Sequence, residues 1–262
     1  MTSAVLLLAA GCGSSSTGPA EVVLLWEDDF EGPAGQLPDP AKWGFDVGTD
    51  WGNAQLEFDT ARPENVSLDG EGNLAITARE EQYEGSSYTS GRITTRGKFS
   101  RARGRFEARI RLPAGRGIWP AFWLLGDNFE TVGWPACGEI DIMEYRGQEP
   151  DVVHGSLHGP GYSGSRAVTS RFVLSGDGFD EGFHTFAIEW DEKGISWFVD
   201  GLVYQRRTAA DLPPGGRWVF DHPFFLILNV AVGGTFVGPP DASTRFPQTM
   251  LVDWVRVYGI DS

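Results

Sequence analysis

The stretch GRFEARIRLPAGRGIWPAFWLLG, residues 104–126, decides the fold class. In its first half, apolar and charged or polar residues alternate over 105–112, so that Phe106, Ala108 and Ile110 share one face. Successive side chains of a strand point to opposite faces, and this alternation therefore predicts a half-buried β-strand. The second half, IWPAFWLL, is apolar on both faces and predicts a second, more deeply buried strand.

Similar strand patterns recur along the whole chain. The predicted strands cover residues 73–79, 105–112, 118–125, 152–158, 184–190, 195–199, 204–206, 224–230 and 251–258. Asp200-Gly201 stands between two of them as a two-residue hairpin turn. Helical periodicity over 11 or more residues is absent, and 208–212 allows one turn at most. Many short strands joined by turns predict an all-β fold, a β-sandwich or jelly roll.

Composition narrows the class of partner. The 262 residues contain 21 Lys and Arg against 36 Asp and Glu, a formal net charge of −15. Binding to nucleic acid requires a basic surface that contacts phosphates, so a nucleic-acid partner is excluded. A chain of this length buries one sizeable core, and a monomer is the default expectation.

The first 20 residues read as a targeting segment. The apolar run 4–10 is far shorter than the roughly 20 residues that span a bilayer, and it matches the apolar region of a secretory signal. The following Ala-Ala-Gly-Cys resembles a lipoprotein box with Cys12 as the lipidated residue, although no Lys or Arg precedes the apolar run. A Gly/Ser-rich tether extends to residue 20, and 21–262 forms the folded domain. We expect a secreted or cell-envelope protein; the alternative is an ordinary cleaved signal, in which Cys12 has no role.

The densest acidic cluster lies in GEIDIMEY, residues 138–145. Glu139 and Asp141 share one face of a strand because they are two positions apart. Regular alternation places Glu144 on the opposite face, but a β-bulge near Ile142-Met143 returns it to the face of the other two. Bulges often lie beside active sites, where they redirect a side chain.

Paired carboxylates on one face suit glycosidic bond cleavage. Retaining glycosidases use two carboxyl groups about 5–5.5 Å apart, one as nucleophile and one as acid/base. An acidic residue between them holds their protonation states apart. The alternative is a solvated strand face with three ordinary carboxylates.

EIDIME resembles the signature of glycoside hydrolase family 16, in the form with the extra bulge residue. The resemblance extends over nearly the whole chain after residue 20, and matching stretches are WEDDFEG near 26, WGNAQLEF near 51, NLAITAR at 73, GRFEARIRLPAGRGIWPAFWLLG from 104, HGSLHGPGYSG from 154, GFHTFAIEWDEKGISWFVDG from 182, FFLILNVAVGG from 224 and VDWVRVY from 252. Within the family, this combination is most similar to bacterial laminarinases, which are endo-β-1,3-glucanases. It implies a jelly-roll sandwich of two antiparallel sheets with a concave substrate cleft.

The resemblance also implies catalytic roles. It implies that Glu139 is the nucleophile, that Asp141 is the residue that assists the nucleophile, and that Glu144 is the general acid/base. It also implies that His158 lies close to these carboxylates. We expect Glu144 to have a raised pKa and Glu139 to be ionised at the working pH. No cofactor is required for this catalysis.

Several further residues are predicted to bind the substrate. Trp119 and Trp123 share a strand face, and indoles stack on the apolar faces of sugar rings; Trp134 lies on the following loop. The resemblance adds Asn53 and Arg92, and Asn229 is polar within an apolar strand. Gln55 departs from the acidic residue expected after WGN. The predicted substrate-binding set is Asn53, Arg92, Trp119, Trp123, Trp134 and Asn229, whereas Trp26, Trp43, Trp190, Trp197 and Trp254 are predicted to be core.

A structural calcium site is implied away from the cleft. Its matching positions are Asp29, the Gly72 carbonyl and Asp253, and oxygen ligands suit this hard cation. The alternative is two surface aspartates with water between them.

The sequence thus predicts a retaining endo-glycosidase that hydrolyses internal β-1,3 bonds of a neutral β-glucan, of the laminarin or mixed-linkage type. One alternative is hydrolysis of another polysaccharide, such as lichenan, agar or carrageenan. A second is a non-catalytic glucan-binding module, although such relatives typically lack one or both glutamates.

Overall fold

The computed structural model describes residues 23–260. The predicted targeting segment, including Cys12, lies outside the described residues, and the domain boundary at residue 20 stays a prediction. Among the described residues, no helix is long and apolar enough to cross a membrane.

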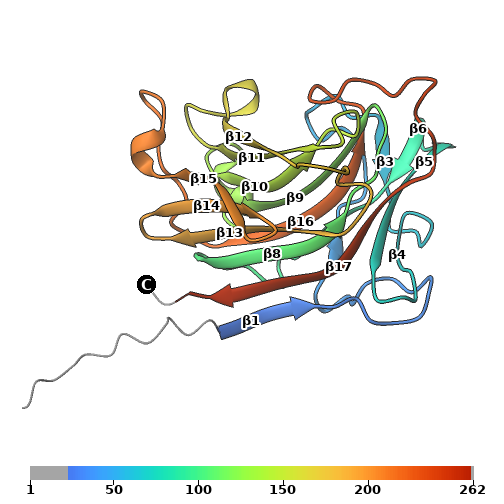
Figure 1. The fold of residues 1–262 in the computed structure, drawn as a ribbon, viewed down its shortest axis with the longest axis horizontal. Coiled ribbons are helices and arrows are strands. Elements are labelled where there is room, and N and C mark those ends of the chain that lie inside the picture. Colours follow the sequence, from blue (N-terminus) through green and yellow to red (C-terminus); the bar gives the residue numbers. More distant parts are fainter. Residues whose placement is uncertain (1–22, 261–262) are drawn as a thin grey trace, which may run out of the picture.

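Two β-sheets make up the fold (Figure 1). The larger one has ten strands in the order β15-β14-β13-β8-β17-β5-β6-β3, with β1 paired to β17 and β4 to β5. Their bounds are β15 Leu202–Arg207, β14 Gly194–Val199, β13 His184–Asp191, β8 Gly104–Arg111, β17 Gln248–Gly259, β5 Leu74–Tyr83, β6 Ser86–Ser90, β3 Glu57–Asp59, β1 Val23–Asp28 and β4 Val66–Leu68.

The smaller sheet has seven strands in the order β12-β11-β10-β9-β16-β7-β2. Their bounds are β12 Val168–Val173, β11 Val152–His158, β10 Glu139–Tyr145, β9 Ile118–Gly126, β16 Phe224–Val232, β7 Arg92–Thr94 and β2 Gly44–Phe45. The helical elements within 23–260 are short: α1 Phe129–Val132, η1 Gly164–Arg166 and η2 Ala209–Asp211. Every strand pairing is antiparallel except that of β3 with β6, which is parallel.

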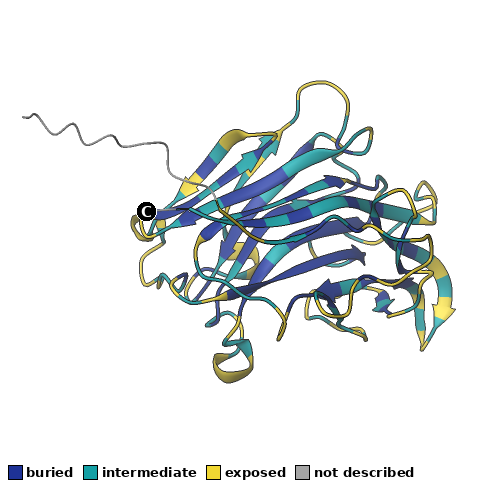
Figure 2. Ribbon diagram, turned by 90° about the horizontal axis from the view of Figure 1, so that it is seen from below, coloured by how far each residue is buried: buried dark blue, intermediate teal, exposed yellow. Residues whose placement is uncertain are grey.

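The core lies between the two sheets. Its largest cluster of buried apolar side chains includes Phe106 and Ile110 of β8 together with Leu124 of β9 and Ile140 of β10. Burial alternates along β8 as the sequence pattern predicts. Figure 2 shows buried segments running through the strands of both sheets. Burial of this apolar surface stabilises the stacked sheets and leaves the other face of the seven-stranded sheet available for a site.

All nine predicted strands are confirmed, and so is the jelly-roll sandwich. Asp200 and Gly201 join β14 to β15 as a two-residue turn with φ angles of 48° and 77°. Both residues need positive φ in such a hairpin, which explains the Asp-Gly pair. The segment 208–212 contains only the single turn of η2.

The prediction for Trp254 is wrong. Trp43, Trp190 and Trp197 are fully buried and Trp26 packs against the core, but Trp254 is partly exposed beneath the Arg256 guanidinium, 4.5 Å from its ring. A register shift between Val252 and Trp254 adds one residue to β17 and turns the indole away from the core.

Candidate active site

The predicted β-bulge is present in β10. Asp141 pairs with Ser156 of β11 and Glu144 pairs with His154, so Ile142 and Met143 together oppose Gly155 alone. Both bulge residues are buried, at 2% and 0% exposure. The extra residue shifts the alternation by one, and Glu144 therefore returns to the face that carries Glu139.

The opposite sheet supports the bulge. Trp197 of β14 donates its indole N–H to the Asp141 carbonyl oxygen at 2.8 Å, across the core. Gly155 makes room for this contact, since a Cβ there would lie 2.5 Å from Trp197 Cδ1 and 2.4 Å from the Tyr204 hydroxyl. Glycine at 155 thus leaves room for the Trp197 indole to reach the Asp141 carbonyl oxygen.

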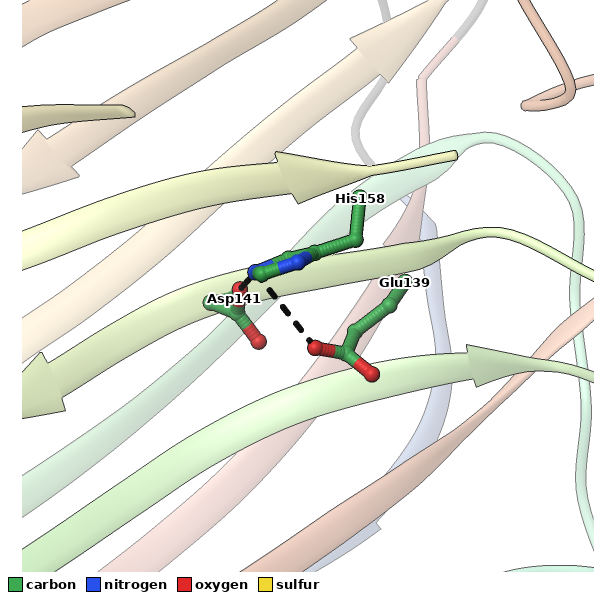
Figure 3. Close-up of side chains that lie close together, drawn as sticks. All are labelled: Glu139, Asp141 and His158. Carbon is green, nitrogen blue, oxygen red and sulfur yellow. Dashed lines mark ion pairs between the residues drawn. The ribbon is translucent and has the colours of Figure 1, made fainter. Parts of the chain in front are cut away.

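Glu139, Asp141 and His158 form one cluster (Figure 3). His158 Nε2 lies 3.1 Å from Asp141 Oδ2 and 3.6 Å from Glu139 Oε1. The cluster is assembled by strand pairing, because Glu139 of β10 is the register partner of His158 of β11. From the preceding loop, Trp134 donates its indole N–H to Glu139 Oε2 at 3.0 Å. The predicted proximity of His158 to the carboxylates is confirmed.

Two side chains hold Glu144. Trp119 of β9 donates its indole N–H to Glu144 Oε1 at 3.2 Å, and the Ser156 hydroxyl donates to Oε2 at 3.4 Å. These two contacts fix the Glu144 carboxyl group on the C-terminal side of the bulge. Asp141 lies between Glu144 and Glu139 along the strand.

Burial and mutual repulsion make both glutamates weak acids. Burial, followed by the charge of Asp141, raises the pKa of Glu144 to about 8. The same two causes raise the pKa of Glu139 to about 7, while His158, Trp134 and Arg92 partly offset them. The raised pKa predicted for Glu144 agrees with this environment. Raised pKa values keep a proton available on these carboxyl groups near neutral pH, which catalysis by a general acid requires.

Opposing influences act on His158. Burial lowers the pKa of its imidazole, but the contact with Asp141 and the charges of Asp141 and Glu139 raise it above the usual value. On the other side of the ring, the Gly164 backbone N–H donates to His158 Nδ1 at 3.1 Å, which favours the neutral ring. Nε2 carries a hydrogen in both the neutral and the charged ring, and it lies 3.1 Å from Asp141 Oδ2 at ion-pair distance, without the alignment of a hydrogen bond.

Three predicted binding residues form a row beside the carboxylates. Trp123 of β9 donates its indole N–H to Asn229 of β16 at 2.8 Å. Arg92 of β7 lies over the Trp123 ring at 4.9 Å and over Trp51 at 4.6 Å, and its Nε donates to Asp46 at 3.1 Å. Asn229 is the register partner of Arg92. The row therefore runs from the catalytic cluster across β9, β16 and β7.

The other predicted binding residues differ in accessibility. Trp134 is 46% exposed and available to a ligand, whereas Trp119 is only 8% exposed and packs 5.2 Å from Phe236. Asn53 is exposed, and its carbonyl accepts the Thr235 N–H at 2.9 Å. Sugar binding by these residues stays a prediction.

Sequence reasoning missed several neighbours of the site. Ser156 was detectable, since it lies two positions from His158 on the same strand face. Trp51, Asp46 and Phe236 lie on loops or at their edges, where the sequence offers no periodic pattern to place them. Cys137, in the loop before β10, is a free thiol and is fully buried.

The implied calcium residues engage arginines. Asp29 accepts from Arg256 at 2.9 Å, and Asp253 accepts from Arg109. Gly72 lies near the Glu31 carboxylate. Each aspartate charge is thus balanced by a guanidinium, and the calcium site stays a prediction.

The ligand atoms of Glu139, Asp141 and His158 lie within 4.8 Å of one another, a spacing that a metal ion also tolerates. The His158 imidazole lies at ion-pair distance from both acids and can balance their negative charge without an ion.

Comparison with known proteins places the chain in a family. The model of the family "Glycosyl hydrolases family 16" matches residues 53–256. A β-glucanase of Rhodothermus marinus is 46% identical over 245 residues, 90% of this chain and 84% of that protein. The laminarinase catalytic domain of Thermotoga maritima MSB8 superimposes with a TM-score of 0.86 at 45% identity, over 94% of this chain and 100% of that one. The endo-β-1,3-glucanase of Pyrococcus furiosus gives a TM-score of 0.86 at 43% identity, over 94% and 100%. The chain therefore belongs to the glycosyl hydrolases of family 16.

Proposed function

We propose that this protein is a retaining endo-β-1,3-glucanase that cuts internal bonds of laminarin-type or mixed-linkage β-glucans. The observation that carries the proposal is the bulge in β10, which brings Glu144 to the face of Glu139 with Asp141 between them. The laminarinases and β-glucanases to which the chain is similar support the substrate class.

The reaction proceeds by two displacements. In the first, the Glu139 carboxylate attacks the anomeric carbon while Glu144 donates its proton to the leaving glycosidic oxygen, which gives a glycosyl ester on Glu139 and a shortened glucan. In the second, Glu144 removes a proton from water, and the water oxygen attacks the anomeric carbon and releases Glu139. Asp141 raises the pKa of both glutamates, and the His158 imidazole, at ion-pair distance from Asp141 and Glu139, offsets part of this effect.

Substrate binding is assigned to the row beside the carboxylates. Trp134 stacks on a sugar ring with its exposed face while its N–H contacts Glu139. Arg92, Asn229 and Asn53 offer polar groups to glucan hydroxyls, and Trp119 and Trp123 line the base of the site. A neutral glucan suits a protein with a net charge of −15 better than a sulfated polymer does.

Placement in the cell is part of the proposal. Lipidation of Cys12 would tether the domain to a membrane through the Gly/Ser segment and expose it to extracellular or periplasmic glucan. A calcium ion at Asp29, Gly72 and Asp253 would stabilise the fold and would not take part in catalysis.

The test is reducing-sugar release by a soluble chain without Cys12 on laminarin, curdlan, barley mixed-linkage glucan, lichenan, agarose and carrageenan. Glu139→Gln removes the nucleophile, and Glu192→Gln makes the same chemical change at an exposed position that pairs with Arg103. We expect release from laminarin that Glu139→Gln abolishes and Glu192→Gln retains. Release from another polymer alone refutes the substrate, and binding without hydrolysis of any polymer refutes the enzyme.

A further inference from the structure

A second pair of buried carboxyl groups lies at the far end of the row that begins at the catalytic cluster. Glu57 and Asp59 of β3 are each 1% exposed. They are two positions apart and therefore project from the same face of the strand. The catalytic mechanism does not use either group.

Asp59 supports the aromatic stack around Arg92. Its Oδ2 accepts the Trp51 indole N–H at 2.8 Å, and Trp51 in turn lies under the Arg92 guanidinium. The other oxygen, Oδ1, is buried and finds no hydrogen-bond partner between residues 23 and 260. Glu57 Oε2 accepts the Val232 backbone N–H at 2.8 Å, which fixes this carboxyl group against β16.

The charges around the pair do not balance if every acid is ionised. Arg92 is bonded to Asp46 at 3.1 Å, and Asp46 also accepts from Arg96 at 2.9 Å. Arg92 is the one guanidinium whose charge acts on both Glu57 and Asp59 among the described residues, and it is already paired with Asp46. An uncompensated buried charge is costly, so one proton remains on the two carboxyl groups of β3. In agreement, burial and the charge of Glu57 raise the pKa of Asp59, and burial raises the pKa of Glu57 to about 7.

We propose that Glu57 and Asp59 together retain one proton, and that Asp59 is a positioning residue that holds Trp51 against Arg92 and so fixes the Trp51–Arg92–Trp123 stack for glucan binding. When this proton is lost, the added negative charge draws Arg92 away from its place between the two indoles. Substrate affinity then falls at high pH while the chemical step at Glu139 is little affected. The kinetic part of this inference rests on the proposed glucanase function.

The protonation of the Glu57–Asp59 pair is tested by NMR, without any substrate. The indole N–H signal of Trp51 is assigned by its loss in Trp51→Phe and followed against pH. We expect the wild-type signal to titrate, Asp59→Asn to abolish the titration, and Glu57→Gln to move it to lower pH because the like charge beside Asp59 is gone. The proposal that the pair retains a proton is overturned if the wild-type signal does not titrate, or if it titrates identically in Asp59→Asn.

The positioning role is tested by kinetics with a matched control. Asp28 accepts the Trp43 indole N–H at 2.8 Å, the same contact in a part of the molecule away from the site. We expect Asp59→Leu to raise KM for laminarin about fivefold with kcat changed less than about twofold, the effect of a loosened cation–π stack, whereas Asp28→Leu leaves KM unchanged.

Asp59→Asn keeps an acceptor for the Trp51 indole N–H but cannot ionise. We therefore expect that its KM for laminarin does not rise at high pH. Equal effects of Asp59→Leu and Asp28→Leu on KM, or an unchanged pH dependence of KM in Asp59→Asn, overturn the positioning role. A wild-type protein without glucanase activity refutes the proposed function, while the NMR titration still decides whether the pair retains a proton.

Discussion

Replacing Asp141 by asparagine removes the negative charge between the two catalytic glutamates and keeps the shape of the side chain. The ligand atoms of Asp141, Glu139 and His158 lie within 4.8 Å of one another. At this separation and an effective dielectric constant of about 20, two unit charges interact by about 3.5 kcal/mol. This energy corresponds to about 2.5 pKa units, part of which is cancelled because His158 loses the partner that favours its charged form. We therefore expect the pKa of Glu139 to fall by about 1–2 units, and that of Glu144 to fall as well.

The assay is kcat/KM on laminarin against pH. In the wild type, activity rises as Glu139 (pKa about 7) loses its proton and declines as Glu144 (about 8) loses its own, and the two limbs report the coupled pair. Asp141→Asn is expected to move both limbs to lower pH, while the surface variant Glu192→Gln leaves them in place. A slower enzyme with unmoved limbs, or limbs that move to higher pH, would refute the electrostatic role of Asp141.

Three further predictions concern the support of the site. Gly155→Ala introduces a Cβ that would lie 2.5 Å from Trp197 and 2.4 Å from Tyr204, and should destabilise the fold by about 1–3 kcal/mol in thermal denaturation; an unchanged Tm would mean that these rings move aside freely. Trp134→Phe removes a hydrogen bond that lowers the pKa of Glu139, so the acid limb of the pH profile should move to higher pH, and a shift to lower pH contradicts this. Chelation by EDTA should leave the initial rate intact but lower the Tm, with recovery on adding Ca²⁺, because an ion bound only by the folded state stabilises it. A lost rate with an unchanged Tm would instead indicate a metal at the cluster in Figure 3.

The core of the site is predictable from the sequence because it lies within one strand. Glu139 and Asp141 share a face by alternation, and the position of Glu144 demands a bulge if it is to act with them. The strands that flank β10 carry long alternating or apolar runs, which identify them without any tertiary information. His158 and Ser156 then follow from strand pairing alone.

The remaining parts depend on contacts between distant segments. Trp197 reaches the Asp141 carbonyl from the opposite sheet, 56 positions away in the sequence, and nothing local to either residue indicates this bond. Arg92 and Asp46 are also hydrogen-bonded although they are 46 positions apart in the sequence. Both lie at or near strands of two or three residues, and strands this short show no periodic pattern in the sequence. The prediction for Trp254 rested on the usual burial of tryptophan, whereas a bulge in β17 turns this indole away from the core.

The central claim, that Glu139 attacks the sugar and Glu144 transfers the proton, is tested most directly by azide rescue followed with proton NMR. Glu139→Ala, given azide and a glucosyl donor with a good leaving group, should release the α-glycosyl azide, because azide enters the space of the missing carboxylate on the face opposite the leaving group. Glu144→Ala should instead give the β-glycosyl azide through an intact Glu139 ester. A β-azide from Glu139→Ala, or an α-azide from Glu144→Ala, would contradict the assigned roles.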